Sequence, residues 1–540
     1  MKNTKVIMES YMKRRRFLKK TGSIAGGIMV LGNVPGIIGS QNAMAASMPN
    51  WADDLIAGQN PKRGGILTYG QTYPNWALGR SKKGEHPYYW IDLLTRCCWN
   101  GLTWVDENFE WQPDLAESVT SNQALDVWTY KLRKGVMFHD GTEFTSADAI
   151  SSMAFHSTAN GFLRKSVLRM ETPDKYTLII RLTSPNAEFP YLTAEYRLMM
   201  MKAGSKDQIG YDGIGTGPFK LVDIDNARQF RAVRNDNYFM DNKPYLDEIK
   251  GVIATGNNAI NGFQAGQLNA VFNIDPGQID QYKSADAQIH AAPAGDQFWL
   301  LLPKNLSYPW NDVLVRKAMS LAIDRPGINR IVYQDPEGWT GNDSHMTGVN
   351  EAFLPRPVER DVAQAKKLLA EAGYPNGIDL PEIVFCSSFP EEPRIYPIVQ
   401  ESMKEAGIRI KFPERPCDGF SAYTAAINKP IGRPRRNLVG PRNPAINLTR
   451  LSDQNSTEPG GWTGAGHDRY NELLPLALKE PDAKKRMIIY HEMQKIAQEE
   501  APGIMLGGRR NMVAFKSGIN NLRSHSQNWS SRFENVWMES

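Results

Sequence analysis

The sequence predicts the α/β class, because helical and strand patterns follow one another along the chain. Residues 361–373 carry apolar side chains at i, i+3, i+4 and i+7, the spacing of a helix with one buried face, and Gly373 is suited to cap its end. Residues 399–406 repeat the pattern more weakly, and after Gly407 a strand is predicted over 408–412. A helix, a glycine and a strand in this order are typical of α/β units.

Other segments add strands and a second helix start. Residues 64–70 predict the first strand after the N-terminal region. Residues 126–139 and 175–182 alternate apolar and polar side chains, as strands with one buried face do, and Lys134-Gly135 predicts a turn within the first of these segments. Thr145 is predicted to cap a helix, with Asp148 as the capping-box acid three residues later.

Two segments nearer the C-terminus contrast with each other. Residues 483–497 predict a long amphipathic helix. Residues 429–445 are rich in proline, glycine and arginine, which predicts a loop at the surface or at the edge of a cleft.

The N-terminal region predicts export. Residues 14–19 read Arg-Arg-Arg-Phe-Leu-Lys, the pattern of a twin-arginine signal, and the apolar stretch 24–38 is too short for a membrane span. Ala43-Met44-Ala45 then supplies a cleavage pattern, so we expect removal of about 45 residues and a periplasmic mature protein. The alternative is a basic, unstructured N-terminus, which leaves the order of these features unexplained.

The basic character of the chain belongs mostly to this leader, residues 1–45. The whole chain has 63 basic and 58 acidic residues; the leader holds eight basic and one acidic, so the remainder carries 55 and 57. Such a balance gives no support to nucleic acid binding. The remaining ~495 residues are enough for two or three domains.

The four cysteines leave two questions open. Cys386 and Cys417 could form a disulfide, whereas for the adjacent Cys97 and Cys98 two buried thiols are favoured over a strained vicinal bridge. No cysteine follows the apolar leader, so we expect a product without a lipid anchor.

The sequence lacks the common short motifs of nucleotide binding, metal binding and nucleophilic catalysis. It contains no GxxxxGK[ST], HExxH or GxSxG pattern, and its eight histidines show no metal-ligand spacing. We therefore expect no metal, no cofactor and no catalytic residue, which favours a binding protein over an enzyme.

Several short blocks of this sequence occur in a specific order and spacing. They are 100–102 (Asn-Gly-Leu), 113–118 (Pro-Asp-Leu-Ala-Glu-Ser), 130–141, 145–149, 215–219 (Gly-Thr-Gly-Pro-Phe), 234–238, Asn305, 315–318, 322–325 (Ala-Ile-Asp-Arg) and 365–377. Taken together, these blocks resemble one family, the extracytoplasmic solute-binding proteins of ABC importers that include oligopeptide, dipeptide and nickel binders. The resemblance extends from about Gly64 to the end of the chain.

The resemblance implies a two-lobed periplasmic-binding-protein fold, type II-like, with an extra subdomain in a discontinuous first lobe. Most motif residues should be structural; Gly215 and Gly217 are expected to allow a tight connection. The expected divisions are the signal peptide at 1–45, the first lobe at 46–89, 206–295 and 505–540, its subdomain at 90–205, and the second lobe at 296–504.

One departure from the family pattern concerns the ligand. Peptide binders of the family carry an acid in the second lobe that pairs with the peptide's α-amino group, and the segment 438–444 here has Arg442 and Asn443 instead. A guanidinium in the cleft suits a carboxylate or phosphate. The alternative is that Arg442 points to solvent and that the correspondence is shifted by several residues.

The leading hypothesis is therefore a solute-binding protein that closes on a peptide-like or other small, anionic solute and delivers it to an ABC permease. We expect a monomer. An exported hydrolase or lyase and a periplasmic chaperone are the alternatives. The candidate ligand contacts, each of which could instead be core or surface, are Tyr73, Trp76, Trp299, Arg442, Asn443 and Trp462.

Overall fold

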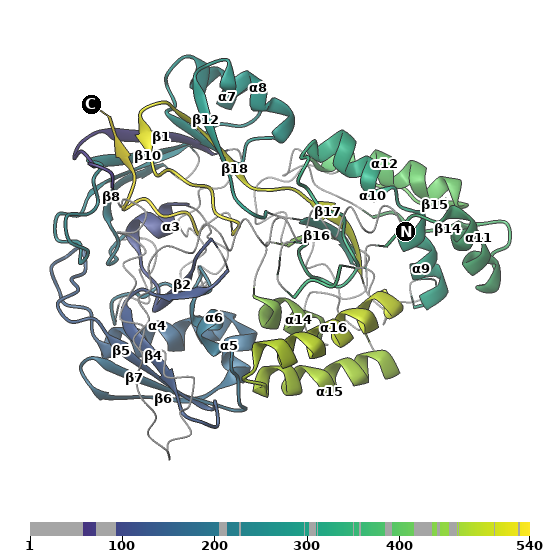
Figure 1. Ribbon diagram of the computed structural model, residues 1–540, viewed down its shortest axis with the longest axis horizontal. Coiled ribbons are helices and arrows are strands. Elements are labelled where there is room, and N and C mark those ends of the chain that lie inside the picture. Colours follow the sequence, from purple (N-terminus) through teal and green to yellow (C-terminus); the bar gives the residue numbers. More distant parts are fainter. Residues whose placement is uncertain are drawn as a thin grey trace, which may run out of the picture. The chain divides into compact units, whose positions relative to one another are not determined.

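The computed structural model confirms an α/β protein (Figure 1). All described residues belong to one compact unit, Asn42–Ser540. The structure describes residues 58–539 except 72–92, 108, 205–212, 226–227, 296, 302–308, 310, 349, 351, 356–357, 384–390, 415–434, 440–442, 453–461, 463, 502 and 528–529.

A seven-stranded mixed sheet forms the first layer, in the order β12-β18-β11-β1-β10-β9-β8. Strand β1 lies between β10 and β11 and runs parallel to both. One face packs on α3 (Leu93–Cys98), and the other on α7 (Asn257–Gln264) and α8 (Ile279–Lys283). The strands are β1 (Ile66–Gln71), β8 (Phe219–Asp225), β9 (Gln229–Arg234), β10 (Glu248–Ile253), β11 (Ala270–Phe272), β12 (Ala287–Ala291) and β18 (Met512–Lys516).

A four-stranded antiparallel sheet, β4-β5-β7-β6, forms a second layer with its own core. Alternation is confirmed in β5, where Trp128, Tyr130 and Leu132 are buried; this strand ends at Leu132, and the predicted turn at Lys134-Gly135 follows it. The elements here are β4 (Ala116–Ser121), β5 (Val127–Leu132), β6 (Val167–Asp174), β7 (Thr177–Leu182), α4 (Ser146–Ala159), α5 (Gly161–Ser166) and α6 (Phe189–Thr193), with β2 (Thr103–Val105) and β3 (Trp111–Pro113) beside them.

A three-stranded antiparallel sheet, β16-β13-β17, lies at the centre of the third part. Its strands are β13 (Gln297–Leu301), β16 (Arg435–Val439) and β17 (Gly503–Gly508). The surrounding elements are α9 (Val313–Ala322), α10 (Arg325–Ile328), η3 (Asn329–Tyr333), α11 (Val362–Glu371), β14 (Ile378–Asp379), α12 (Glu392–Glu405), β15 (Ile408–Arg409), α14 (Pro444–Ser452), α15 (Ala465–Lys479) and α16 (Ala483–Glu500).

The predicted loop at 429–445 is wrong in its centre. Residues 435–439 form β16, which pairs with β13, and α14 begins at Pro444. Local composition favours a loop, but backbone pairing with a neighbouring strand decides the conformation.

The predicted helix at 399–406 begins earlier than expected. Helix α12 starts at Glu392, although Pro397 lies inside it. Buried contacts of Ile395, Tyr396 and Val399 stabilise this first part, which periodicity alone could not show. The strand predicted after it is only Ile408–Arg409.

Other local predictions are confirmed. Asp148 accepts hydrogen bonds from the backbone N–H and the hydroxyl of Thr145, both at 2.8 Å, at the start of α4. Helix α11 begins after Asp361, and Gly373 has a φ of +92°. Helix α16 buries Tyr490, Met493 and Ala497.

The glycines of the Gly-Thr-Gly block are required by close approach, as expected. A Cβ on Gly215 would lie 1.9 Å from the carbonyl oxygen of Cys98. A Cβ on Gly217 would lie 2.4 Å from the carbonyl carbon of Cys98. Cys97 and Cys98 are buried thiols, and burial raises the pKa of Cys98. Cys386 and Cys417 lie outside the described residues.

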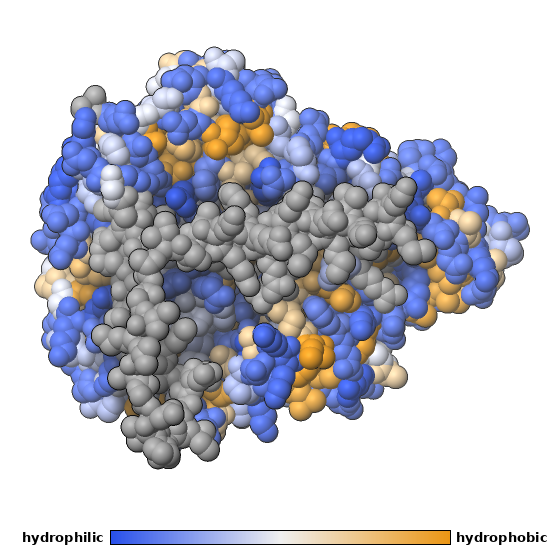
Figure 2. Space-filling view, in the orientation of Figure 1, coloured by the Kyte–Doolittle hydropathy of each residue, from blue (hydrophilic) through white to orange (hydrophobic). Residues whose placement is uncertain are grey.

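The face seen in Figure 2 is mostly hydrophilic, with apolar side chains among the polar ones. Leu476 on α15 and Ile488 on α16 are exposed large apolar residues. Within the described residues no helix is long and apolar enough to cross a membrane.

Candidate ligand-binding site

Two short connectors join the seven-stranded sheet to the three-stranded sheet. The chain leaves β12 through residues 292–295 to reach β13, and it returns from β17 through residues 509–511 to reach β18. The connectors run antiparallel: Ala292 N–H donates to Asn511 O at 2.8 Å, and Asn511 N–H donates to Ala294 O at 3.0 Å. A paired, two-strand connection of this kind is suited to act as a hinge between lobes.

The connectors touch closely. A Cβ on Gly295 would lie 2.2 Å from the carbonyl oxygen of Arg509 and 2.6 Å from the backbone nitrogen of Asn511. A larger residue would push the two segments apart, so glycine fixes their spacing.

Ion pairs surround this hinge. Arg509 donates two hydrogen bonds to Glu391 Oε1, at 2.7 and 3.1 Å, and a third to Ile274 O at 3.4 Å. Both side chains of the Arg509–Glu391 pair are buried. Arg509 therefore connects α12 of the third part to the end of β11 in the seven-stranded sheet.

Further pairs secure the same region. Arg510 donates to both oxygens of Asp335, with the shortest contact at 2.8 Å, and these hydrogen bonds hold the pKa of Asp335 below its ordinary value despite burial. Arg394 of α12 lies 2.7 Å from Asp275, which follows β11. The hinge thus has charge contacts on both sides.

Buried acceptor oxygens gather beside the hinge. Gln71 is the last residue of β1, and its partner in register on β11 is Phe272. Asn273 directly follows Phe272. Within the described part of the chain, Gln71 Oε1, Asn273 Oδ1 and Glu391 Oε2 accept no hydrogen bond although they are buried. Ligands of open α/β sheets bind at the carboxyl ends of parallel strands, which is where Gln71 and Asn273 lie.

Sequence reasoning missed these three residues. Each is polar and ordinary in its local context, and only the end of a predicted strand could have pointed to Gln71. The others gain their significance from burial and from segments distant in sequence.

The structure describes only some of the predicted ligand contacts. Tyr73, Trp76 and Arg442 lie outside the described residues. Trp299 lies in β13, opposite Asn437 of β16 and Met505 of β17, where the pairing with β17 shifts register.

The side chains of Asn443 and Trp462 contact other parts of the protein. Asn443 Oδ1 accepts from Ala445 N–H at 2.8 Å, as an N-cap of α14 does, and its Nδ2 donates to Glu188 at 3.2 Å. Trp462 is 1% exposed and packs against Tyr470, with ring centroids 5.0 Å apart. The structure brings neither of them to the hinge residues described above.

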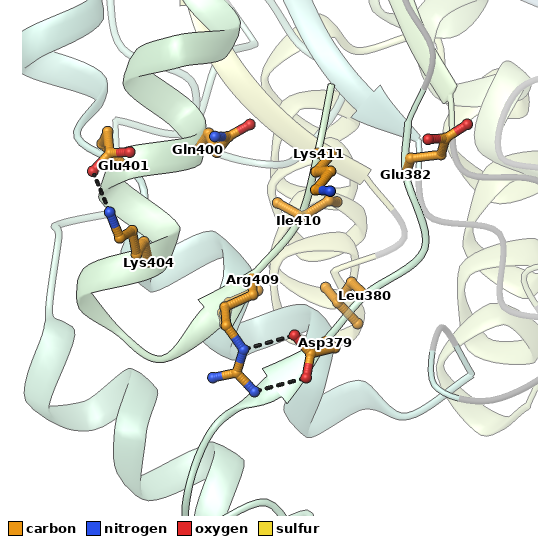
Figure 3. A pocket seen from close by; sticks show the side chains of 10 residues that line it. Asp379, Leu380, Glu382, Gln400, Glu401, Lys404, Arg409, Ile410 and Lys411 are labelled. Atoms are coloured by element: carbon orange, nitrogen blue, oxygen red, sulfur yellow. Dashed lines mark hydrogen bonds and ion pairs between the residues drawn. The ribbon is translucent and has the colours of Figure 1, made fainter. Parts of the chain in front are cut away.

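A surface groove lies elsewhere, between α12 and the strands β14 and β15 (Figure 3). Its charges are largely paired: Arg409 contacts Asp379 at 2.6 Å, and Lys404 contacts Glu401 at 3.3 Å. Because these groups already satisfy one another, the groove is a weaker candidate than the hinge side of β1 and β11.

Metal binding finds no support in this geometry. Among the described residues, no group of three or more His, Cys, Asp and Glu is placed to hold a metal ion.

Comparison with known proteins decides the family. The model of the bacterial extracellular solute-binding proteins, family 5 (middle region), matches residues 110–428, more than half of the chain. The chain belongs to this family. It is a substrate-binding protein of the ABC-transporter type, as the sequence blocks implied, and members of the family act outside the cytoplasm.

Relatives and solved structures agree with this assignment. The glutathione-binding protein GsiB of Escherichia coli (strain K12) is 27% identical over 460 residues, covering 80% of this chain and 88% of GsiB. DppA from Helicobacter pylori, solved with the peptide STSA, superimposes with a TM-score of 0.75 at 20% identity, covering 89% and 99% of the two chains.

Two further structures show the same fold. AgaA from A. tumefaciens R10, solved with agropinic acid, has a TM-score of 0.75 at 21% identity, covering 88% of this chain and 99% of AgaA. NikA from Staphylococcus aureus, solved with Ni(L-His)2, has a TM-score of 0.74 at 16% identity, covering 88% and 100%. The two-lobed family 5 fold predicted from the sequence blocks is therefore confirmed.

Proposed function

We propose that this protein captures a small, amino-acid-derived solute between its lobes and delivers it to an ABC permease. The observation that carries the proposal is the paired hinge, residues 292–295 with 509–511, beside buried acceptor oxygens at the carboxyl ends of β1 and β11. Closure about such a hinge would cover a solute held there, and no chemistry is required.

The lobe boundaries are part of the proposal. The seven-stranded sheet takes its strands from three separate parts of the chain: 66–71, 219–291 and 512–516. This supports a first lobe that is discontinuous in sequence. The subdomain at 90–205 then lies between its first two parts, and the second lobe starts near residue 296. We place the return to the first lobe at 509–511 rather than 505, because β17 pairs with β13 as far as Gly508.

The solute is proposed to carry both a donor group and an acid. Glu391 Oε2 and the amide oxygens of Gln71 and Asn273 suit an ammonium or N–H donor. Arg442, in place of the family's acid, suits a carboxylate. Glutathione, peptides and agropinic acid, which the names of similar proteins mention, belong to this chemical range.

Calorimetric titration with glutathione, a dipeptide and agropinic acid tests the proposal, each compared with an N-acetylated or esterified derivative where one exists. Binding that is lost when either charge is blocked supports it. Binding that is insensitive to both would contradict the proposed recognition. Mass spectrometry of small molecules released from the protein purified from its own periplasm would identify the natural solute.

A matched pair of variants tests Glu391. Glu391→Gln should weaken binding of an ammonium-bearing solute about tenfold or more, because a charge-assisted hydrogen bond is lost. Asp335→Asn disrupts the neighbouring pair with Arg510 and serves as the control for hinge stability. Equal affinities in the two variants would remove Glu391 from the site.

Export to the periplasm is proposed to follow the twin-arginine route. Residues 14–19 and the cleavage pattern at 43–45 support this. No observation favours the hydrolase, lyase or chaperone alternatives.

A further inference from the structure

Glu188 connects two parts of the molecule that are far apart in sequence. It directly precedes α6, beside the four-stranded sheet, and its carboxylate faces α14 and α16. Glu188 Oε1 accepts from Asn443 Nδ2 at 3.2 Å and lies 3.4 Å from Arg486 Nε. Glu188 Oε2 accepts a hydrogen bond from the hydroxyl of Tyr490.

The contact is buried and electrically balanced. Glu188 is 7% exposed, Asn443 6% and Tyr490 2%. Arg486 is anchored at the turn between α15 and α16, where it donates to Glu480 O at 2.5 Å. Burial and the negative charge of Glu188 raise the pKa of Tyr490, so its phenol remains a donor at neutral pH.

A backbone hydrogen bond supports the same contact. Ala187 N–H donates to Leu478 O, near the end of α15, at 2.7 Å. In Figure 1 helix α6 lies next to α16, in agreement with the hydrogen bond between Tyr490 and Glu188. The subdomain and the helical layer therefore meet here through both side chains and main chain.

The covalent connection between these parts lies elsewhere, at the hinge of 292–295 and 509–511. Glu188 is separated from Asn443 by 255 residues and from Tyr490 by 302. When a two-lobed binding protein opens about its hinge, a contact between the lobes that lies away from the hinge breaks on opening and forms on closure.

We propose that Glu188, with Asn443, Arg486 and Tyr490, is a latch that holds the two lobes closed. In the closed form these groups satisfy one another in a buried setting. In the open form water solvates them, so removing one partner penalises the closed form alone. The latch therefore sets the balance between closed and open protein, and through it the retention of any solute, without touching the solute.

The inference depends on the two-lobed fold and not on the identity of the solute. Its failure would leave the proposed ligand class untouched, and a wrong ligand class would leave the latch in place.

Two tyrosines of the same helical layer provide a matched test. Tyr490→Phe removes the hydroxyl that reaches Glu188, whereas Tyr470→Phe removes one that donates to Leu448 O at 2.9 Å within the layer. Both side chains are buried in the same core. Small-angle scattering of the solute-free protein should give a larger radius of gyration for Tyr490→Phe than for the unaltered protein, and no change for Tyr470→Phe.

A second variant changes the subdomain partner of the latch, Glu188. Glu188→Gln removes the charge facing Arg486, and it should also enlarge the protein and speed hydrogen exchange at the Ala187 amide at least tenfold. In the double variant with Tyr490→Phe, the effect should be smaller than the sum of the two. Unchanged radii and unchanged Ala187 exchange in both single variants would overturn the latch, as would equal changes in Tyr490→Phe and Tyr470→Phe.

Discussion

At the residue scale, the part of the molecule around the three-stranded sheet contains a buried ion pair. Arg325 Nη2 lies 2.8 Å from Asp343 Oδ1, and the two side chains are 1% and 2% exposed. Arg325 Nε also donates to Met505 O, and Met505 N–H donates to Asp343. This network attaches the segment around residue 343 to β17, and each polar group in it depends on the others.

Asp343→Asn should lower the free energy of unfolding by about 3–5 kcal/mol, because it leaves the Arg325 guanidinium buried without its counter-charge. Asp379→Asn breaks the Arg409 pair, which is largely exposed and screened by solvent, and it should lower the free energy of unfolding far less than Asp343→Asn does. Urea unfolding of both variants checks the difference, and similar losses would show that burial is not the cause.

Gly215→Ala should be strongly destabilising, by more than about 3 kcal/mol, because its Cβ would meet the backbone of Cys98. Gly161→Ala, at the start of α5, meets only the end of the Arg164 side chain at 3.6 Å and should stay within about 1 kcal/mol of the unaltered protein. Thermal unfolding compares them; a mild effect at Gly215 would mean that the two segments can separate.

Residue-level prediction from the sequence succeeded where the reason is local. The capping pair Thr145–Asp148 and the C-cap Gly373 follow from rules that span a few positions. Glu188 and Asn273 carried no such signal, because their partners come from other elements of the fold. The predicted ligand contacts remain predictions: Tyr73, Trp76, Trp299, Arg442, Asn443 and Trp462.

At the element scale, periodicity located the helices that it predicted, α11, α12 and α16, but it gave their limits less well and did not point to α9 or α15. Helix α11 begins and ends close to the expected residues, because Asp361 and Gly373 are residue types that favour helix ends. Helix α12 and strand β16 depend on tertiary packing and pairing, which local composition does not encode.

The N-terminus of α4 offers a test of capping. Asp148 accepts from the N–H and hydroxyl of Thr145 and from Ala203 N–H, whereas Asp361 of α11 accepts from Gln364 N–H in a more exposed setting. Asp148→Ala should cost about 1–2 kcal/mol and Asp361→Ala about 0.5–1 kcal/mol. Denaturant unfolding would contradict this if the two losses came in the reverse order.

At the scale of the whole molecule, buried histidines make stability depend on pH. Burial lowers the pKa of His156, His290 and His525 to about 4 from an ordinary value of 6.5. His525 Nδ1 accepts from Gln527 N–H at 2.9 Å, which requires the neutral ring. Between pH 6.5 and about 4 the unfolded chain therefore binds protons that the folded chain does not.

Stability should consequently be highest above pH 6.5 and fall as the pH decreases towards 4. Glu107, whose pKa is raised by burial, acts in the opposite direction near the acid end of this window, and Asp140, with a pKa lowered to about 2, does not titrate within it. Urea unfolding at pH 7.5 and 5 checks the sign. His525→Gln should reduce the difference; an unchanged pH dependence would exclude His525 as a contributor.

Export provides a second test at this scale. Replacing Arg14 and Arg15 by Lys should leave uncleaved precursor in the cytoplasm, and the exported unaltered protein should begin at about Ala46. Export of the double-Lys variant at normal efficiency would rule out the twin-arginine route.

The position of β18 has a consequence for the order in which the chain can fold. This strand, Met512–Lys516, lies between β11 and β12 in the seven-stranded sheet, although both of those strands are synthesised more than 200 residues earlier. Until almost the whole chain has been synthesised, β11 and β12 face a gap in the sheet, and the core around the seven-stranded sheet is incomplete. We therefore expect this sheet to complete its folding after synthesis, and a chain that stops after residue 508 to remain unfolded here although every residue up to the end of β17 is present.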